Sequence, residues 1–137
     1  MPCLGLMHLR SAAFCLIFTL MLEASAFSEV RESVTIKSCY DGDTCRTTTG
    51  EKIRLACIDT PELRGKRAQP ERAKAARERL RGMVVGRTVN LRRITTDRYG
   101  RTVCELYVDG MNVQQAMVAS RQAEIYWKYA HQCPWSK

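Results

Sequence analysis

Alternating hydrophobic and polar residues predict β-strands in the first half of this chain. Val34, Ile36 and Ser38 alternate with polar residues, and an Asp-Gly-Asp turn over residues 41–43 then reverses the chain into a threonine-rich strand. Three later segments are also predicted to be strands. The predicted strands are residues 34–38, 44–48, 52–58, 89–94 and 102–108.

Two segments instead have the spacing of a helix. Pro70 suits the first turn of a helix and Glu71 suits its positive end. Apolar residues then recur every three or four positions, at Ala73, Ala76, Leu80, Met83 and Val84. Asn112 is a suitable cap for a second helix, with Val113, Ala116, Met117 and Ser120 on one side.

Five strands with two helices between and after them predict an α+β protein, mainly β, built as a small closed barrel. Closure would remove exposed strand edges. Periodicity alone leaves other α+β folds open.

The N-terminus has the pattern of an export signal. Arg10 precedes an apolar run over residues 11–22, and small residues follow at 24–26, as in an A-x-A cleavage site. We therefore expect a signal peptide over residues 1–26 and one mature domain over residues 27–137, secreted or periplasmic. The alternatives are an uncleaved anchor, for which the run is shorter than the roughly 20 residues that span a bilayer, and a buried helix.

The net charge of the chain is strongly positive. The formal net charge is +8, and removal of residues 1–26 takes one charge of each sign, from Arg10 and Glu23. A small domain with this excess attracts polyanions. Solubility alone would also explain it.

Five cysteines remain in the predicted mature chain. Cys39 and Cys45 lie symmetrically about Gly42, so a tight reversal would bring them together, and we expect this disulfide first. Cys57 with Cys104 is the second expected pair. Without a Cys-x-x-Cys pair, a zinc site has little support.

Carboxylates and arginines near strand ends could serve phosphodiester hydrolysis, which needs a held phosphate, charge neutralisation and an activated water. Asp43 and Asp59 could bind a hard cation such as Ca²⁺. Arg54 and Arg101 could both donate paired hydrogen bonds to one phosphate, and Glu62 could accept a proton from water. In a straight strand Arg54 and Asp59 would lie on opposite faces, so the hypothesis requires a bend, which we expect at residues 59–61.

Taken singly, each residue has a simpler explanation. An Asp-Gly-Asp sequence is usually only a hairpin turn. A single arginine is usually a surface charge, and residues 59–62 could merely end a strand. Their joint order and spacing decide the interpretation.

Three segments together resemble the signature stretches of the thermonuclease (staphylococcal nuclease-like) family: residues 41–44, 54–62 and 97–101. The resemblance runs from about Val34 to Tyr129. It implies an OB-fold barrel with helices and a monomeric, calcium-dependent nuclease. Such an enzyme hydrolyses the bond to the 5′ oxygen in DNA, and also in RNA, leaving 3′-phosphate ends.

The resemblance also implies roles for matching residues. Asp43 and Asp59 become calcium ligands, with the Thr60 carbonyl as a third ligand and Asp41 as a supporting carboxylate. Arg54 and Arg101 become phosphate clamps, and Glu62 the general base. The substrate-binding residues are Arg98, Tyr99 beside a terminal phosphate, and Tyr129 beside a base.

Three departures from the family stand out. The loop between Glu62 and Pro70 is shorter than in its best-known member, and Arg98 stands where that member has lysine. The sequence ends at Lys137, so we expect the usual C-terminal helix to be missing. A disulfide to Cys133 or packing of Trp135 could compensate.

Two rival functions fit part of the pattern. A non-catalytic OB-fold module could bind nucleic acid through basic grooves and stacking aromatics, although such members lose the acidic or arginine positions. An envelope-surface protein could bind anionic lipid or polysaccharide, but this would not explain why Asp43, Arg54, Asp59, Glu62 and Arg101 coexist.

Overall fold

The computed structural model describes residues 31–137. The predicted signal peptide, residues 1–26, lies outside the described residues. Within residues 31–137, no helix has the length and apolar character that crossing a membrane requires.

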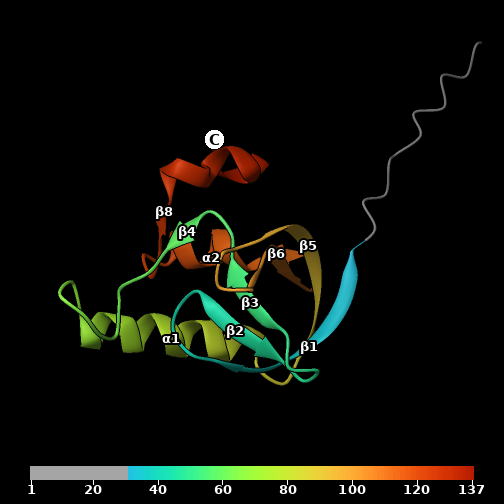
Figure 1. Ribbon diagram of the computed structural model, residues 1–137, viewed down its shortest axis with the longest axis horizontal. Helices are drawn as coiled ribbons and strands as arrows, with labels where there is room; N and C mark the ends of the chain where they lie inside the picture. The colour runs from blue at the N-terminus through green and yellow to red at the C-terminus, as the bar shows by residue number, and fades with distance from the viewer. Residues whose placement is uncertain (1–30) are drawn as a thin grey trace, which may run out of the picture.

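A closed barrel of five strands forms the body of the molecule (Figure 1). Its strands are β1 (Glu32–Cys39), β2 (Thr44–Thr47), β3 (Lys52–Leu55), β5 (Thr88–Thr96) and β6 (Thr102–Val108). They follow the order β3-β2-β1-β5-β6, and a parallel pairing of β3 with β6 closes the ring. The barrel and its strands are thus as predicted, with one exception.

The exception is the strand expected over residues 52–58, which breaks after Leu55. Cys57 adopts a left-handed backbone with φ of 64°, and the chain then enters a separate short strand, β4 (Ile58–Asp59). β4 pairs with β8 (Glu124–Ile125), while β7 (Met111–Asn112) extends the main sheet beside β6. The prediction of one continuous strand was wrong because it missed this corner.

Both predicted helices are present. Helix α1 (Pro70–Val84) buries the five apolar residues named above and begins with proline. Helix α2 (Val113–Ala119) begins at Asn112, whose side-chain oxygen accepts a hydrogen bond from the Gln115 backbone N–H at 2.9 Å. The barrel interior and the inner faces of these helices form one apolar core, with Ile36, Leu55 and Leu80 fully buried.

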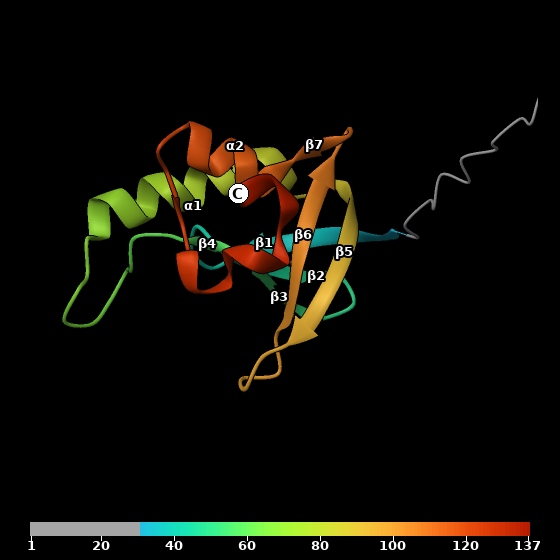
Figure 2. The same cartoon turned by 90° about the horizontal axis from the view of Figure 1, so that it is seen from above.

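The C-terminal segment forms two 3₁₀ helices, η1 (Trp127–Gln132) and η2 (Pro134–Ser136). In Figure 1 this segment, in red, lies on the same side of the barrel as β4 and β8, away from α1. Figure 2 shows it between β4 and the β5–β6 hairpin.

Two disulfides are formed within residues 31–137. Cys39 bonds to Cys45, as expected, and these residues face each other across β1 and β2. The pairing of Cys57 with Cys104 was wrong: Cys57 bonds to Cys133, and Cys104 remains a buried thiol. Cys104 points into the barrel core, whereas Cys57 lies at the corner after β3, under the C-terminal segment.

Candidate active site

A buried carboxylate at the start of β2 organises the site. Asp43 is 6% exposed, and its Oδ2 lies 3.2 Å from Nη2 of Arg54 and accepts a hydrogen bond from the Thr60 hydroxyl at 3.0 Å. Its Oδ1 accepts a hydrogen bond from the Thr44 hydroxyl at 3.0 Å. A buried charge is tolerable when it is paired and hydrogen-bonded in this way.

The Arg54 side chain fills the corner between β3 and β4. Nη1 donates to the Leu55 carbonyl at 2.5 Å and Nη2 donates to the Ile58 carbonyl at 2.9 Å. The corner at Cys57 therefore brings Arg54 and the residues after Ile58 to one place. The required bend exists, but it lies at residues 56–57 rather than at 59–61.

Asp41 and Asp59 lie close enough to Asp43 for their charges to interact. Burial, and then the negative charge of Asp43, raises the pKa of Asp41 to about 6. The same two causes, in the same order, raise the pKa of Asp59, with Arg54 opposing them. Negative charge is thus concentrated around Asp43 and only partly balanced by Arg54.

Glu62 lies farther along the chain, in the loop between β4 and α1. Its side chain is exposed, and its backbone carbonyl accepts a hydrogen bond from the Gln69 N–H at 2.9 Å, which closes the loop. Glu62 contributes to the raised pKa of Asp59, so the two carboxylates interact electrostatically. Glu62 does not line either of the cavities described below.

The turn after β5 presents Arg101. Oδ1 of Asp97 accepts backbone N–H groups from Tyr99 and Arg101, at 2.9 and 3.0 Å, and Oδ2 accepts Nε of Arg101 at 2.7 Å. Nη1 of Arg101 donates to the Thr44 hydroxyl at 3.4 Å. Because that hydroxyl in turn donates to Asp43, Arg101 is linked to the same carboxylate as Arg54.

Arg98 and Tyr99 lie at the exposed tip of this turn. Nη2 of Arg98 donates to the Tyr99 hydroxyl at 2.6 Å, and its guanidinium carbon lies 4.8 Å from the centre of the ring. The guanidinium carbon of Arg101 lies 5.4 Å from the same ring. The two cations therefore stack against one aromatic side chain.

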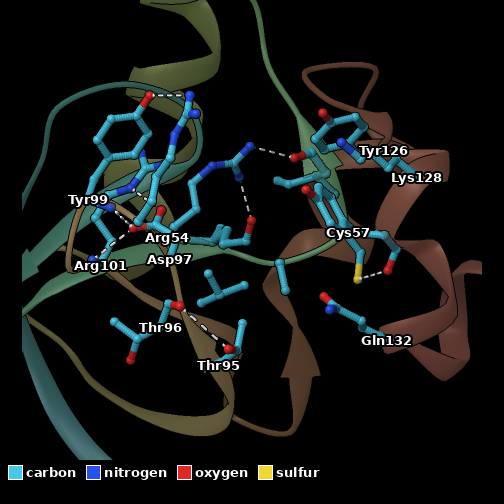
Figure 3. Close-up of a pocket in the computed structure, with 16 residues that line it drawn as sticks. Arg54, Cys57, Thr95, Thr96, Asp97, Tyr99, Arg101, Tyr126, Lys128 and Gln132 are labelled. Carbon is cyan, nitrogen blue, oxygen red and sulfur yellow. Dashed lines mark hydrogen bonds and ion pairs between the residues drawn. The ribbon is translucent and has the colours of Figure 1, made fainter.

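A cavity of about 580 Å³ lies between this turn and the C-terminal segment (Figure 3). Arg54 points into its middle, with Tyr99 and Arg101 on one side and Tyr126 and Lys128 on the other. Of the predicted site residues, those lining it are Arg54, Arg98, Tyr99, Arg101 and Tyr129. Asp59 and Thr60 line a separate pocket of about 130 Å³, and neither cavity is lined by Asp41 or Asp43.

Sequence reasoning missed part of the cavity wall. Tyr126, Lys128 and Gln132 line it. Lys128 and Gln132 lie in η1, and Tyr126 directly precedes that 3₁₀ helix. The available signal was composition: residues 126–129 are three aromatic residues and one lysine, a combination typical of nucleic-acid-binding grooves.

The candidate metal ligands are all oxygen atoms. Within residues 31–137, no group of three or more His, Cys, Asp or Glu side chains is arranged to hold a metal ion. The candidate donors are instead the Asp43 and Asp59 carboxylates together with the Thr60 carbonyl. This all-oxygen set, with its excess negative charge, fits a hard cation better than zinc.

Comparison with known proteins decides the family. The family described as "Staphylococcal nuclease homologue" matches residues 52–135, more than half of the chain. The chain belongs to the staphylococcal nuclease family. The prediction from the three signature segments is therefore confirmed.

Individual proteins similar to this chain carry endonuclease or nuclease names. An "Uncharacterized endonuclease" of Escherichia coli O157:H7 is 36% identical over 93 residues, which cover 65% of this chain and 58% of that protein. An "Uncharacterized endonuclease" of Haemophilus influenzae is 34% identical over 120 residues, covering 85% of this chain and 63% of that protein. The "Probable staphylococcal-like nuclease CAN1" of Oryza sativa subsp. japonica is 40% identical over 78 residues, which cover 57% of this chain and 22% of that protein. The chain thus spans less than two thirds of the length of these relatives.

Proposed function

We propose that this protein is an exported, calcium-dependent nuclease that hydrolyses phosphodiester bonds of DNA and RNA and leaves 3′-phosphate ends. One observation carries the proposal. Arg54 and Arg101 line the same cavity and are both connected to the buried carboxylate of Asp43, one directly and one through Thr44.

The two arginines bind the phosphate. A guanidinium group offers several N–H donors in a fixed plane, which matches the oxygens of a phosphate better than lysine does. Donors fixed before reaction are most effective where negative charge grows in the transition state. Here Asp97 and the carbonyls of Leu55 and Ile58 fix the two side chains.

The carboxylates bind the cation and activate the attacking water. Asp43 and Asp59, with the Thr60 carbonyl and Asp41 in support, would hold the ion. When bound, Ca²⁺ supplies positive charge that neutralises the reacting phosphate. Glu62, exposed and close enough to Asp59 to affect its pKa, orients the attacking water and accepts its proton.

The aromatic side chains bind the nucleoside. Tyr99 on one side of the cavity and Tyr126 on the other present ring surface to bases (Figure 3). Tyr129 also lines the cavity, and Lys128 adds positive charge. Stacking of this kind tolerates many sequences, which favours a substrate range that includes both DNA and RNA.

Export is supported by two separate observations. Residues 1–26 have the pattern of a signal peptide, and both disulfides suit an oxidising compartment.

The test is digestion of plasmid DNA, a single-stranded DNA oligonucleotide and an RNA oligonucleotide by the purified protein, with Ca²⁺ and then with a chelator. We expect cleavage only with Ca²⁺, and 3′ ends that a polymerase extends only after phosphatase treatment. The Arg54→Ala variant should lose cleavage, and Arg79→Ala, an exposed arginine of α1, should keep it. Binding without cleavage in either condition would instead support the non-catalytic module.

A further inference from the structure

One wall of the cavity is built by the C-terminal segment, residues 126–136. This wall contributes Tyr126, Lys128, Tyr129 and Gln132 to the cavity. The chain reaches it from α2 through residues 120–123 and the two-residue strand β8, which pairs with β4. Its position must therefore be fixed by contacts with the barrel.

Those contacts converge on the corner between β3 and β4. The Tyr126 N–H donates to the Cys57 carbonyl at 2.9 Å, and Sγ of Cys57 lies 3.3 Å from the Tyr129 carbonyl oxygen. Cys133, fully buried, is bonded to Cys57. One residue of the corner thus contacts both ends of the segment.

The same corner orients Arg54. Cys57 lies between Leu55 and Ile58, whose carbonyls accept the two Nη groups of Arg54. Its left-handed backbone, with φ of 64°, gives the turn that brings both carbonyls to the guanidinium. A non-glycine residue is disfavoured in this conformation, so surrounding contacts must maintain it.

Noncovalent contacts of several kinds accompany the disulfide in this region. Ala56, Cys57 and Cys133 form a buried cluster separate from the main core, and Trp135 is half-buried where the two meet. Beyond the core, Nη2 of Arg92 donates to the Gln132 carbonyl at 2.8 Å, and Nε of the same arginine pairs with the buried Glu105. Ile94 and Val103 also pack against the cluster, and β4 pairs with β8 just before the wall begins. Within residues 31–137, the disulfide is the covalent cross-link between wall and barrel.

We propose that the Cys57–Cys133 disulfide is the positioning element of the cavity, and that nucleic-acid cleavage therefore requires its oxidised form. The inference rests on the proposed nuclease function. Reduction by a small dithiol breaks the S–S bond and adds two electrons and two protons, giving two thiols, while the dithiol closes to its own disulfide. The wall then separates from the corner, and the cavity loses its base-binding side.

Both tryptophans of the sequence, Trp127 and Trp135, lie in this segment. Their fluorescence therefore reports on the wall, whereas far-UV circular dichroism reports mainly on the barrel and its helices. On treatment with dithiothreitol we expect a red shift of tryptophan emission as Trp135 becomes exposed, with the barrel spectrum retained. We expect kcat/KM on a single-stranded DNA oligonucleotide to fall at least tenfold, mostly through KM, and to recover on reoxidation.

Two double variants assign the effect to one bond. Cys57→Ser with Cys133→Ser should show the low kcat/KM in both conditions, and Cys39→Ser with Cys45→Ser should keep the tenfold response to dithiothreitol whatever its starting rate. Equal kcat/KM with and without the Cys57–Cys133 bond would overturn the proposal. Melting of the whole barrel when the Cys39→Ser, Cys45→Ser variant is reduced would also overturn it, because the Cys57–Cys133 bond would then be a general stabiliser. An inactive oxidised protein would contradict the nuclease function itself.

Discussion

Gly42 occupies a position where a single methyl group should disturb both the fold and the site. A Cβ atom at this position would lie 2.8 Å from Cβ of Ala76 in α1, and 2.9 and 3.0 Å from Cγ2 and Cβ of Thr60. Real Cβ contacts are longer, so Gly42→Ala must push α1 or Thr60 away. Thr60 cannot move without weakening its hydrogen bond to Asp43.

Overpacking of this kind destabilises proteins by about 1–3 kcal/mol. In a small domain each kcal/mol lowers Tm by roughly 4–8 °C, so we expect a Tm lower by about 5–20 °C. Calcium-dependent cleavage, measured well below Tm, should also fall, since Asp43 and Thr60 are displaced.

Gly82→Ala is the matched control. Gly82 lies within α1, and a Cβ there would meet no atom within 4 Å. The same substitution should therefore stabilise the helix, by roughly 0.5–1 kcal/mol, and leave cleavage unchanged. Because both variants restrict the unfolded chain alike, their difference isolates the steric effect, and thermal unfolding by circular dichroism measures it. A Gly42→Ala protein as stable as Gly82→Ala would refute the reasoning.

Further predictions concern the charged groups. Arg54→Lys should lower the initial rate of DNA cleavage by about 10²–10³-fold, because lysine cannot reproduce the planar fork that contacts Leu55, Ile58 and Asp43; a loss under tenfold would argue against the phosphate clamp. The raised pKa of Asp41, about 6, means that the folded protein binds this proton more tightly than the unfolded chain does. Stability without Ca²⁺ should therefore fall as pH rises from about 4 to above 6, and a urea titration at pH 5 and 7.5 should show a smaller fall for Asp41→Asn. If only the folded protein binds Ca²⁺, each tenfold increase in Ca²⁺ concentration above Kd should raise the free energy of unfolding by about 1.4 kcal/mol. A Tm that does not change with Ca²⁺ concentration at pH 7.5 would count against the metal site.

Local sequence predicted most of the scaffold because the relevant signals were local. The apolar spacing of α1 identified its five buried residues, and Asn112 identified the start of α2. Alternation identified the barrel strands. It failed at Cys57, because a left-handed corner depends on contacts with a distant segment and leaves no trace in the pattern of apolar residues.

The candidate site was predictable only in part for the same reason. The signature residues could be named from their order, but the connection of Arg101 to Asp43 through Thr44 appears only in three dimensions. The wall containing Tyr126 and Lys128 was missed because short 3₁₀ turns have too little periodicity to detect. The partner of Cys57 depended on the position of that wall.

The central claim is that Arg54 and Arg101 act on one phosphate, and a double-mutant cycle tests it most directly. Calcium-dependent cleavage of one oligonucleotide would be measured under single-turnover conditions for Arg54→Ala, Arg101→Ala and the double variant. Groups that act as a unit are strongly non-additive, so each single variant should lose at least about 100-fold and the double variant little more than either. Losses that simply multiply, or single variants near the wild-type rate, would contradict the account.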